Sequence, residues 1–82
     1  MSPEEVRLKL CDVLAETEIH VEKDGSHYLI TAIGELFVGK RQVQRQQLIY
    51  AALSNEIADG HIHAVHMRIF TPEEWQRRSP TA

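Results

Sequence analysis

The sequence predicts a small α/β domain of the α+β kind, with the element order α-β-β-α-β-α and a three-stranded mixed sheet. An Asp24-Gly25 turn signal separates two strand-like stretches, which is typical of an antiparallel hairpin. A helical pattern then precedes a third strand-like stretch, so the third strand can pair in parallel with one hairpin strand. The helices are therefore expected mainly on one face of the sheet.

The chain has 82 residues, which suits one domain. We expect that domain over residues 1–78 and a disordered tail over residues 79–82. A net charge of −3 argues against a general polyanion binder, and a single cysteine, Cys11, excludes an intramolecular disulfide. No apolar run approaches the roughly 20 residues that span a membrane, and the acidic start is unlike a signal peptide. The cytoplasm is the expected location.

The first helix is predicted from Pro3 to Ala15. Ser2 is a suitable N-cap, Pro3 suits the first helical position, and acidic residues follow at the positive end of the helix dipole. Apolar residues recur at helical spacing and predict one core-facing stripe: Val6, Leu10, Val13 and Leu14.

The hairpin follows as two strands, Glu18–Lys23 and His27–Ile33. In the first, Ile19 and Val21 alternate with polar residues, which indicates one buried face. The second is apolar at both alternating sets of positions, which predicts the more central place in the sheet. His27 is expected just past the turn, at the end of the sheet.

The connection Gly34–Arg41 contains two glycines and an apolar segment, residues 36–38. We expect this segment to pack against the core, with contact to a partner as the alternative. The next helix is predicted over Gln42–Ala58, and Gly60 can end it in the left-handed conformation. Basic residues cluster at the start of this helix, where the dipole disfavours them: Lys40, Arg41 and Arg45. They indicate either an acidic partner or ordinary surface charge.

The third strand is predicted to end at Phe70. Alternation divides it into a more apolar, core-facing row (His63, Val65, Met67 and Ile69) and an opposite row (Ile62, Ala64, His66, Arg68 and Phe70). Thr71-Pro72-Glu73-Glu74 then repeats the N-cap, proline and glutamate pattern of a helix start. We expect Trp75 to fold back as an apolar lid.

The histidines of the third strand do not predict a self-contained metal site. His61 and His63 point to one side and His66 to the other, and no cysteine or carboxylate stands at ligand spacing. A site that takes imidazole from this chain and its other ligands from a partner is the alternative, with His63 and His27 as candidates. The sequence contains no nucleophile elbow, phosphate loop or paired apolar carboxylates, so we do not expect an enzyme.

A nucleic-acid role is the other chemistry to weigh. The element order resembles a KH-type domain, which clamps a single strand with a Gly-x-x-Gly loop. In this chain the loop reads Gly39-Lys40-Arg41-Gln42, and the second glycine is missing. The usual clamp is therefore not in place.

Several motifs together resemble the BolA family, and most closely its IbaG-type branch, over roughly residues 3–76. Where the main branch usually carries Arg-His, this chain has Arg45-Gln46, which fits the IbaG-type branch. The motifs that carry the resemblance are Asp24-Gly25-Ser26-His27-Tyr28, Gly34-Glu35-Leu36-Phe37-Val38-Gly39, Val43-Gln44-Arg45-Gln46-Gln47, Ile62-His63-Ala64-Val65 and Phe70-Thr71-Pro72-Glu73-Glu74-Trp75.

The resemblance implies a class II KH-like fold and a monothiol glutaredoxin as partner. In that family the two proteins hold a bridging [2Fe-2S] cluster, to which the glutaredoxin and glutathione supply thiolates and the BolA-like chain supplies imidazole. The ligand positions map onto His63 and, as the nearest match, His27. The isolated chain is expected to hold no cofactor. Candidates for partner contact are Phe37, Gly39 and Arg45.

Two other functions stay open. The first is a nucleic-acid-binding transcriptional or stress-response regulator, as family members are often described, with a patch of Lys40, Arg41 and Arg45. The second is a stress-response interaction domain with no cluster. The leading expectation is an adaptor in iron–sulfur cluster trafficking and iron homeostasis, which can also form a weak homodimer.

Overall fold

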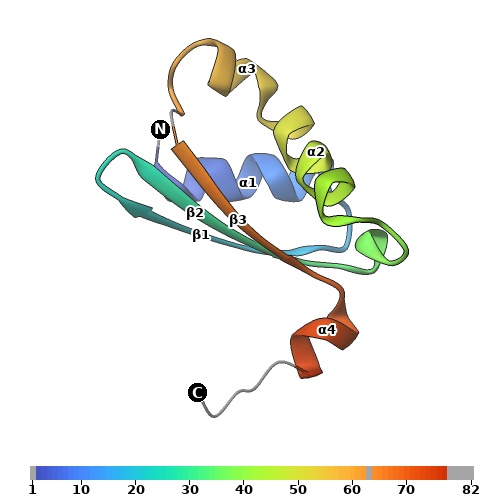
Figure 1. The fold of residues 1–82 in the computed structure, drawn as a ribbon. Helices are drawn as coiled ribbons and strands as arrows, with labels where there is room; N and C mark the ends of the chain where they lie inside the picture. The colour runs from blue at the N-terminus through green and yellow to red at the C-terminus, as the bar shows by residue number, and fades with distance from the viewer. Residues whose placement is uncertain (1, 63, 78–82) are drawn as a thin grey trace.

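The computed structural model describes residues 2–62 and 64–77 of the chain. The predicted tail at residues 79–82 and the candidate ligand His63 lie outside the described residues. Figure 1 shows the predicted element order, with a 3₁₀ turn (η1) after the hairpin and the second helix in two pieces. The elements are α1 (Pro3–Val13), β1 (Glu18–Asp24), β2 (His27–Ile33), η1 (Glu35–Phe37), α2 (Gln42–Ala52), α3 (Ser54–Ala58), β3 (Ala64–Phe70) and α4 (Pro72–Arg77).

The sheet has the order β1-β2-β3, so the predicted central position of β2 is confirmed. β1 and β2 are antiparallel, with Asp24 opposite His27 across the turn. β2 and β3 are parallel, and their register runs from His27 beside Ala64 to Ile33 beside Phe70. α1, α2 and α3 lie on one side of this mixed sheet, and α4 follows the far end of β3 (Figure 1). The predicted architecture is thus confirmed.

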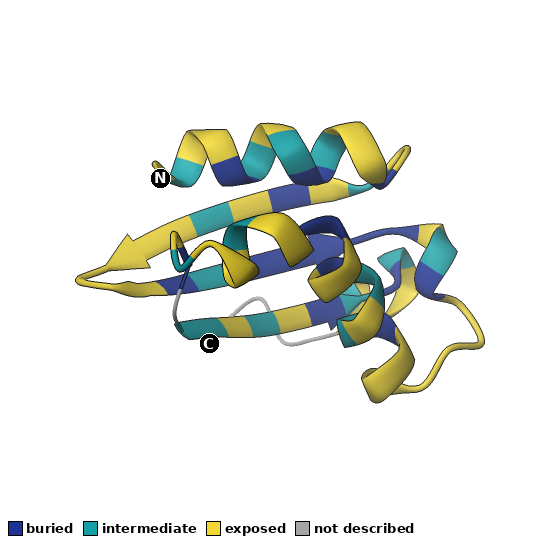
Figure 2. Cartoon of the chain, turned by 90° about the horizontal axis from the view of Figure 1, so that it is seen from above, coloured by how far each residue is buried: buried dark blue, intermediate teal, exposed yellow. Residues whose placement is uncertain are grey.

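The core lies between the sheet and the helices. Figure 2 shows that burial concentrates in the middle of the sheet and on the sheet-facing side of α1, whereas the hairpin end is exposed. The fully enclosed side chains come from every layer: Phe37, Leu10, Ile30, Ile49, Leu53, Ile62 and Val6. The opposite face of the sheet is polar and exposed along β1, whereas in β2 it carries Leu29, Thr31 and Ile33, and the last two are buried.

α1 begins as predicted. The Ser2 Oγ accepts a hydrogen bond from the Glu5 N–H (3.1 Å), and the Glu5 carboxylate accepts one from the Ser2 N–H (3.1 Å). This reciprocal pair is a capping box. The prediction for Val13 was wrong, because it is 54% exposed. It lies at the edge of the stripe in the last helical turn, and Leu14 takes the buried position at the helix end.

The predicted helix Gln42–Ala58 is interrupted at Leu53, which is a correction to the sequence analysis. Leu53 leaves the helical region (φ −107°, ψ 13°) while its side chain stays fully buried. After this change of direction Ile57 is 36% exposed, so it does not extend the buried side of α2 into α3. Gly60 ends α3 at φ +78°, and the His61 N–H reaches the Glu56 carbonyl (3.0 Å), which confirms the predicted left-handed cap.

Candidate functional site

The histidine end of the parallel strand pair is the first candidate site. His27 is exposed and begins β2, directly beside Ala64, the first residue of β3. The starts of β2 and β3 therefore lie side by side in the described part of the chain. His63, the other candidate ligand, precedes Ala64 in the sequence.

His66 lies near His27, which the sequence analysis did not predict. Both side chains are exposed, and their ring centroids are 6.1 Å apart with the planes tilted by 31°. In the register His66 pairs with Leu29, two residues after His27 and on the same face. The proximity follows from the register in which β2 and β3 pair, and the periodicity within a single strand does not reveal that register.

This face carries a cavity of about 600 Å³ beside the two histidines. The cavity has acidic residues of β1 on one side and the ends of β2 and β3 on the other. Its lining comprises Glu22, Lys23, Asp24, His27, Tyr28, Leu29, His66, Met67 and Arg68. The site is an open, partly charged surface, and imidazole is its characteristic functional group.

The segment that leads into the histidine end is anchored by Glu56. Its carbonyl accepts hydrogen bonds from the N–H groups of His61 (3.0 Å) and Ile62 (3.3 Å). Its carboxylate binds the Lys9 ammonium at 2.6 Å, which joins α3 to α1. The hydrogen bond from Lys9 lowers the pKa of Glu56. These contacts hold the segment that precedes β3 against α3.

The second candidate region is the connection between β2 and α2. Phe37 in η1 is fully buried in the core, so its side chain is not at the surface. Gly39 is exposed and has φ +77°, a conformation that favours glycine. Val38 is 56% exposed. Of the residues expected to contact a partner in this loop, Gly39 is accessible and Phe37 supports the loop from beneath.

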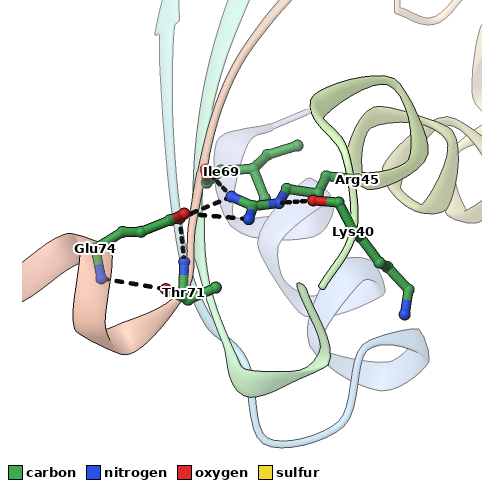
Figure 3. Close-up of polar contacts among 5 residues, drawn as sticks. All are labelled: Lys40, Arg45, Ile69, Thr71 and Glu74. Atoms are coloured by element: carbon green, nitrogen blue, oxygen red, sulfur yellow. Dashed lines mark hydrogen bonds and ion pairs between the residues drawn. The ribbon is translucent and has the colours of Figure 1, made fainter. Parts of the chain in front are cut away.

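Arg45 is the most enclosed charged residue of the described chain, at 5% exposure. Its guanidinium donates to the carbonyls of Lys40 (3.0 Å) and Ile69 (3.2 Å). It also makes a two-pronged ion pair with the Glu74 carboxylate, at 2.7 Å and 3.2 Å (Figure 3). These contacts join the start of α2, the end of β3 and α4 in one network, which we name the Arg45–Glu74 clamp.

Glu74 also completes the start of α4. Its carboxylate accepts the Thr71 N–H (2.9 Å), while its own N–H donates to the Thr71 hydroxyl (3.1 Å) (Figure 3). This confirms the helix start predicted from residues 71–74. The hydrogen bonds from Arg45 and then from the Thr71 backbone lower the pKa of Glu74 to about 2. The carboxylate is therefore ionised throughout the physiological pH range.

The clamp changes the interpretation of the basic cluster. Lys40 and Arg41 are exposed, but the charge of Arg45 is buried against Glu74. The three cations therefore do not form a common surface patch. The unfavourable position of Arg45 near the start of α2 is offset by the Glu74 carboxylate and by the carbonyls that it binds.

The candidate ligand His27 and the candidate partner contacts lie at opposite ends of β2. His27 begins the strand, whereas Phe37, Gly39 and Arg45 lie beyond its last residue, Ile33. Seven strand residues span about 20 Å. Sequence analysis gave these residues separate roles, as a metal ligand and as partner contacts, and the fold places them in two regions (Figure 1).

No group of three or more His, Cys, Asp or Glu side chains within residues 2–62 and 64–77 is placed to hold a metal ion. In the same part of the chain, no helix has the length and apolar character needed to cross a membrane.

Comparison with known proteins identifies relatives across almost the whole chain. A family profile described as BolA-like protein matches residues 4–74. The chain is 44% identical over 77 residues to the "Acid stress protein IbaG" of Escherichia coli K12, covering 94% of this chain and 92% of that protein. It is 34% identical to the "DNA-binding transcriptional regulator BolA" of Vibrio cholerae, covering 90% and 71% respectively. A bolA protein homologue from Coxiella burnetii superposes with a TM-score of 0.81 at 26% identity, covering 94% and 99%.

Proposed function

The chain belongs to the BolA family, and from that premise we propose that it is an adaptor which pairs with a monothiol glutaredoxin and shares a [2Fe-2S] cluster with it. The observation that carries the proposal is the position of His27, exposed and in register with the residue that follows His63. The adaptor functions in iron–sulfur and iron homeostasis and in the stress response, is cytoplasmic, and is not an enzyme.

The donor groups of the chain fit a shared cluster. His27 offers an exposed imidazole, whereas Cys11 is half-buried on α1 and packs against the core. The Arg7 guanidinium lies 3.9 Å from the Cys11 sulfur, one turn earlier on the same helix. The thiolates must therefore come from outside, which the glutaredoxin cysteine and glutathione provide. Imidazole in place of thiolate raises the potential of a [2Fe-2S] centre and supplies a ligand that leaves when protonated.

The distance between the His27 end of β2 and the loop at Gly39 is within the size of one protein interface. An interface of standard size buries about 800 Å² on each side, a patch about 30 Å across. One glutaredoxin can therefore reach from His27 to the loop at Gly39. In this arrangement Gly39 is the contact, and Phe37 and Arg45 hold the loop in position.

Cluster reconstitution tests the proposal. The chain is mixed with a monothiol glutaredoxin, glutathione, iron and sulfide without oxygen, and visible circular dichroism is recorded. We expect a spectrum distinct from that of the glutaredoxin homodimer. It should be lost with His63→Ala, altered with His27→Ala and retained with His20→Ala, an exposed histidine of β1. A spectrum that equals the homodimer's contradicts the proposal.

The interface requires a separate measurement. Amide shifts of the labelled chain on addition of apo-glutaredoxin should change at both His27 and Gly39. Shifts confined to the histidine end would remove the loop from the interface and leave the cluster proposal intact. Shifts confined to the loop would remove the histidines.

A DNA-binding regulator is the second candidate, favoured by the similarity to the Vibrio cholerae protein of that name. Lys40 and Arg41 are exposed and available for phosphates, whereas Arg45 is engaged by Glu74. Binding through two cations should have a shallow salt dependence, with a slope of about 2 in log K against log salt. Loss of low-salt DNA binding in the Lys40→Ala/Arg41→Ala variant would support this function, and its absence in the wild type would end it.

A further inference from the structure

We propose that His27 and His66 form a further metal site, a two-imidazole site for a divalent transition-metal ion such as Zn²⁺, which shares His27 with the proposed cluster site. It differs from the proposed cluster site in using His66, and it needs no partner and no glutathione. The observation that carries it is the ring-centroid distance of 6.1 Å between exposed histidines of adjacent parallel strands.

The distance is close to the one that a shared ion requires. Zinc binds imidazole nitrogen at about 2.0–2.1 Å, so two rings on one tetrahedral ion have centroids about 5 Å apart. The observed 6.1 Å is longer by about 1 Å, and a small side-chain rotation closes that difference. Exposed side chains can adjust χ1 and χ2 to point a nitrogen at a common ion at little cost, because neither ring is packed in the core.

The surroundings favour a cation. Glu22 and Asp24 line the same cavity and supply negative potential. The two basic residues of the lining are directed at aromatic rings. Lys23 Nζ lies 5.5 Å from the centre of the Tyr28 ring, and the Arg68 guanidinium lies 6.0 Å from that of Phe70. Their charges are therefore partly engaged elsewhere.

The site is open, which defines its chemistry. Among residues 2–62 and 64–77 no third ligand completes the set, so the remaining positions are available to water or to a group from another molecule. Imidazole selects zinc, copper and nickel over magnesium and calcium, which prefer oxygen. Because His27 belongs to both sites, a bound divalent ion withdraws one proposed ligand from the cluster.

Zinc titration of the full chain without partner tests this site. Calorimetry and the imidazole signals in NMR are followed near pH 7.5, where an ordinary imidazole is neutral. We expect one Zn²⁺ per chain, shifts at His27 and His66, and affinity at least about tenfold weaker in His27→Ala and in His66→Ala. The matched control His20→Ala, on the same sheet face, should bind as the wild type does, and Mg²⁺ should not bind.

Two results overturn the proposal. One is a zinc affinity that stays unchanged in His66→Ala, whatever the effect of His63→Ala on zinc binding. The other is an equal loss in His20→Ala, which would indicate binding by any exposed histidine. His66→Ala in the cluster reconstitution separates this site from the proposed function, because it should lose zinc affinity and keep the cluster spectrum. The failure of either proposal thus leaves the other measurable.

Discussion

The two ends of the β2–β3 pair differ in how the side chains beyond the strands are used. At the end of Ile33 and Phe70, the Arg45–Glu74 clamp binds three elements together, and the Gly34 N–H donates to the Phe70 carbonyl (3.0 Å). At the start of both strands, His27 and His66 are exposed and adjacent. One end is fixed by internal contacts, and the other presents groups that can bind an external ion.

This difference suggests a division between stability and function. Polar groups that are buried must find partners within the chain, so the clamp end uses its charges for structure. Imidazoles that remain exposed keep a lone pair for a ligand at little cost in folding free energy. Substitutions at the two ends should therefore separate unfolding from binding, and the following variants test that separation.

Phe37→Ala should have the largest effect on stability. The side chain is fully buried beneath the loop at the clamp end, and its loss leaves a cavity that costs about 3–5 kcal/mol. Urea unfolding measures the change, with Phe37→Leu in reserve if the alanine variant does not fold. The neighbouring control Val38→Ala, at an exposed position, should change stability by less than about 0.5 kcal/mol. Equal effects of the two variants would contradict the burial of Phe37.

Arg45→Met should come next. It keeps much of the side-chain volume but removes the donors to two carbonyls and the Glu74 carboxylate, for an expected loss of about 2–4 kcal/mol. The control is Arg77→Met, which breaks an exposed pair with Glu73 on α4 and should be nearly neutral. A small loss for both variants would mean that the clamp does not hold the end of β3.

The clamp should also make stability depend on acid. The folded pKa of Glu74 is about 2, against a usual value near 4.5, so the unfolded chain binds more protons between these pH values. The stability from this group is present above about pH 4.5 and is lost as pH falls toward 2. Glu74→Gln should flatten that part of the unfolding curve. Glu73→Gln, on the same helix, should leave it steep, and a flat wild-type curve would contradict the shift.

The fold was predictable where its signals are local. The Ser2 cap, the Asp24-Gly25 turn and the helix start at Thr71 each lie within a few residues of the structure that they specify. The break at Leu53 was missed because apolar residues continue at helical spacing through it, and the burial of Leu53 at the break depends on tertiary packing. Arg45 and Glu74 are 29 residues apart, so no periodicity could pair them.

The candidate site was predictable only in part, for the same reason. The position of His27 at the start of a strand follows from the hairpin. Alternation along the third strand predicts that His66 points to the other side of the sheet from the residues directly before and after it. Their proximity depends on the parallel register of β2 and β3, which sequence pattern leaves undetermined. The separation of the ligand candidate from the partner-contact candidates also depends on the fold, because the loop that carries Gly39 follows Ile33 at the other end of β2.

The smallest effect on stability should come from the histidine end, and the two aromatic pairs allow a matched test. Phe70 and Trp75 meet edge to face at 5.4 Å at the clamp end, while His27 and His66 lie 6.1 Å apart at the other. Trp75→Ala should cost about 1 kcal/mol or more, because Trp75 is half-buried. The His27→Ala/His66→Ala double variant should stay within about 0.5 kcal/mol of the wild type, because both rings are exposed. Urea unfolding in the presence of a chelator measures both. If the double variant loses as much stability as Trp75→Ala, the two histidines contribute to folding stability, and the proposed separation between a stabilising end and a ligand-binding end of the sheet is wrong.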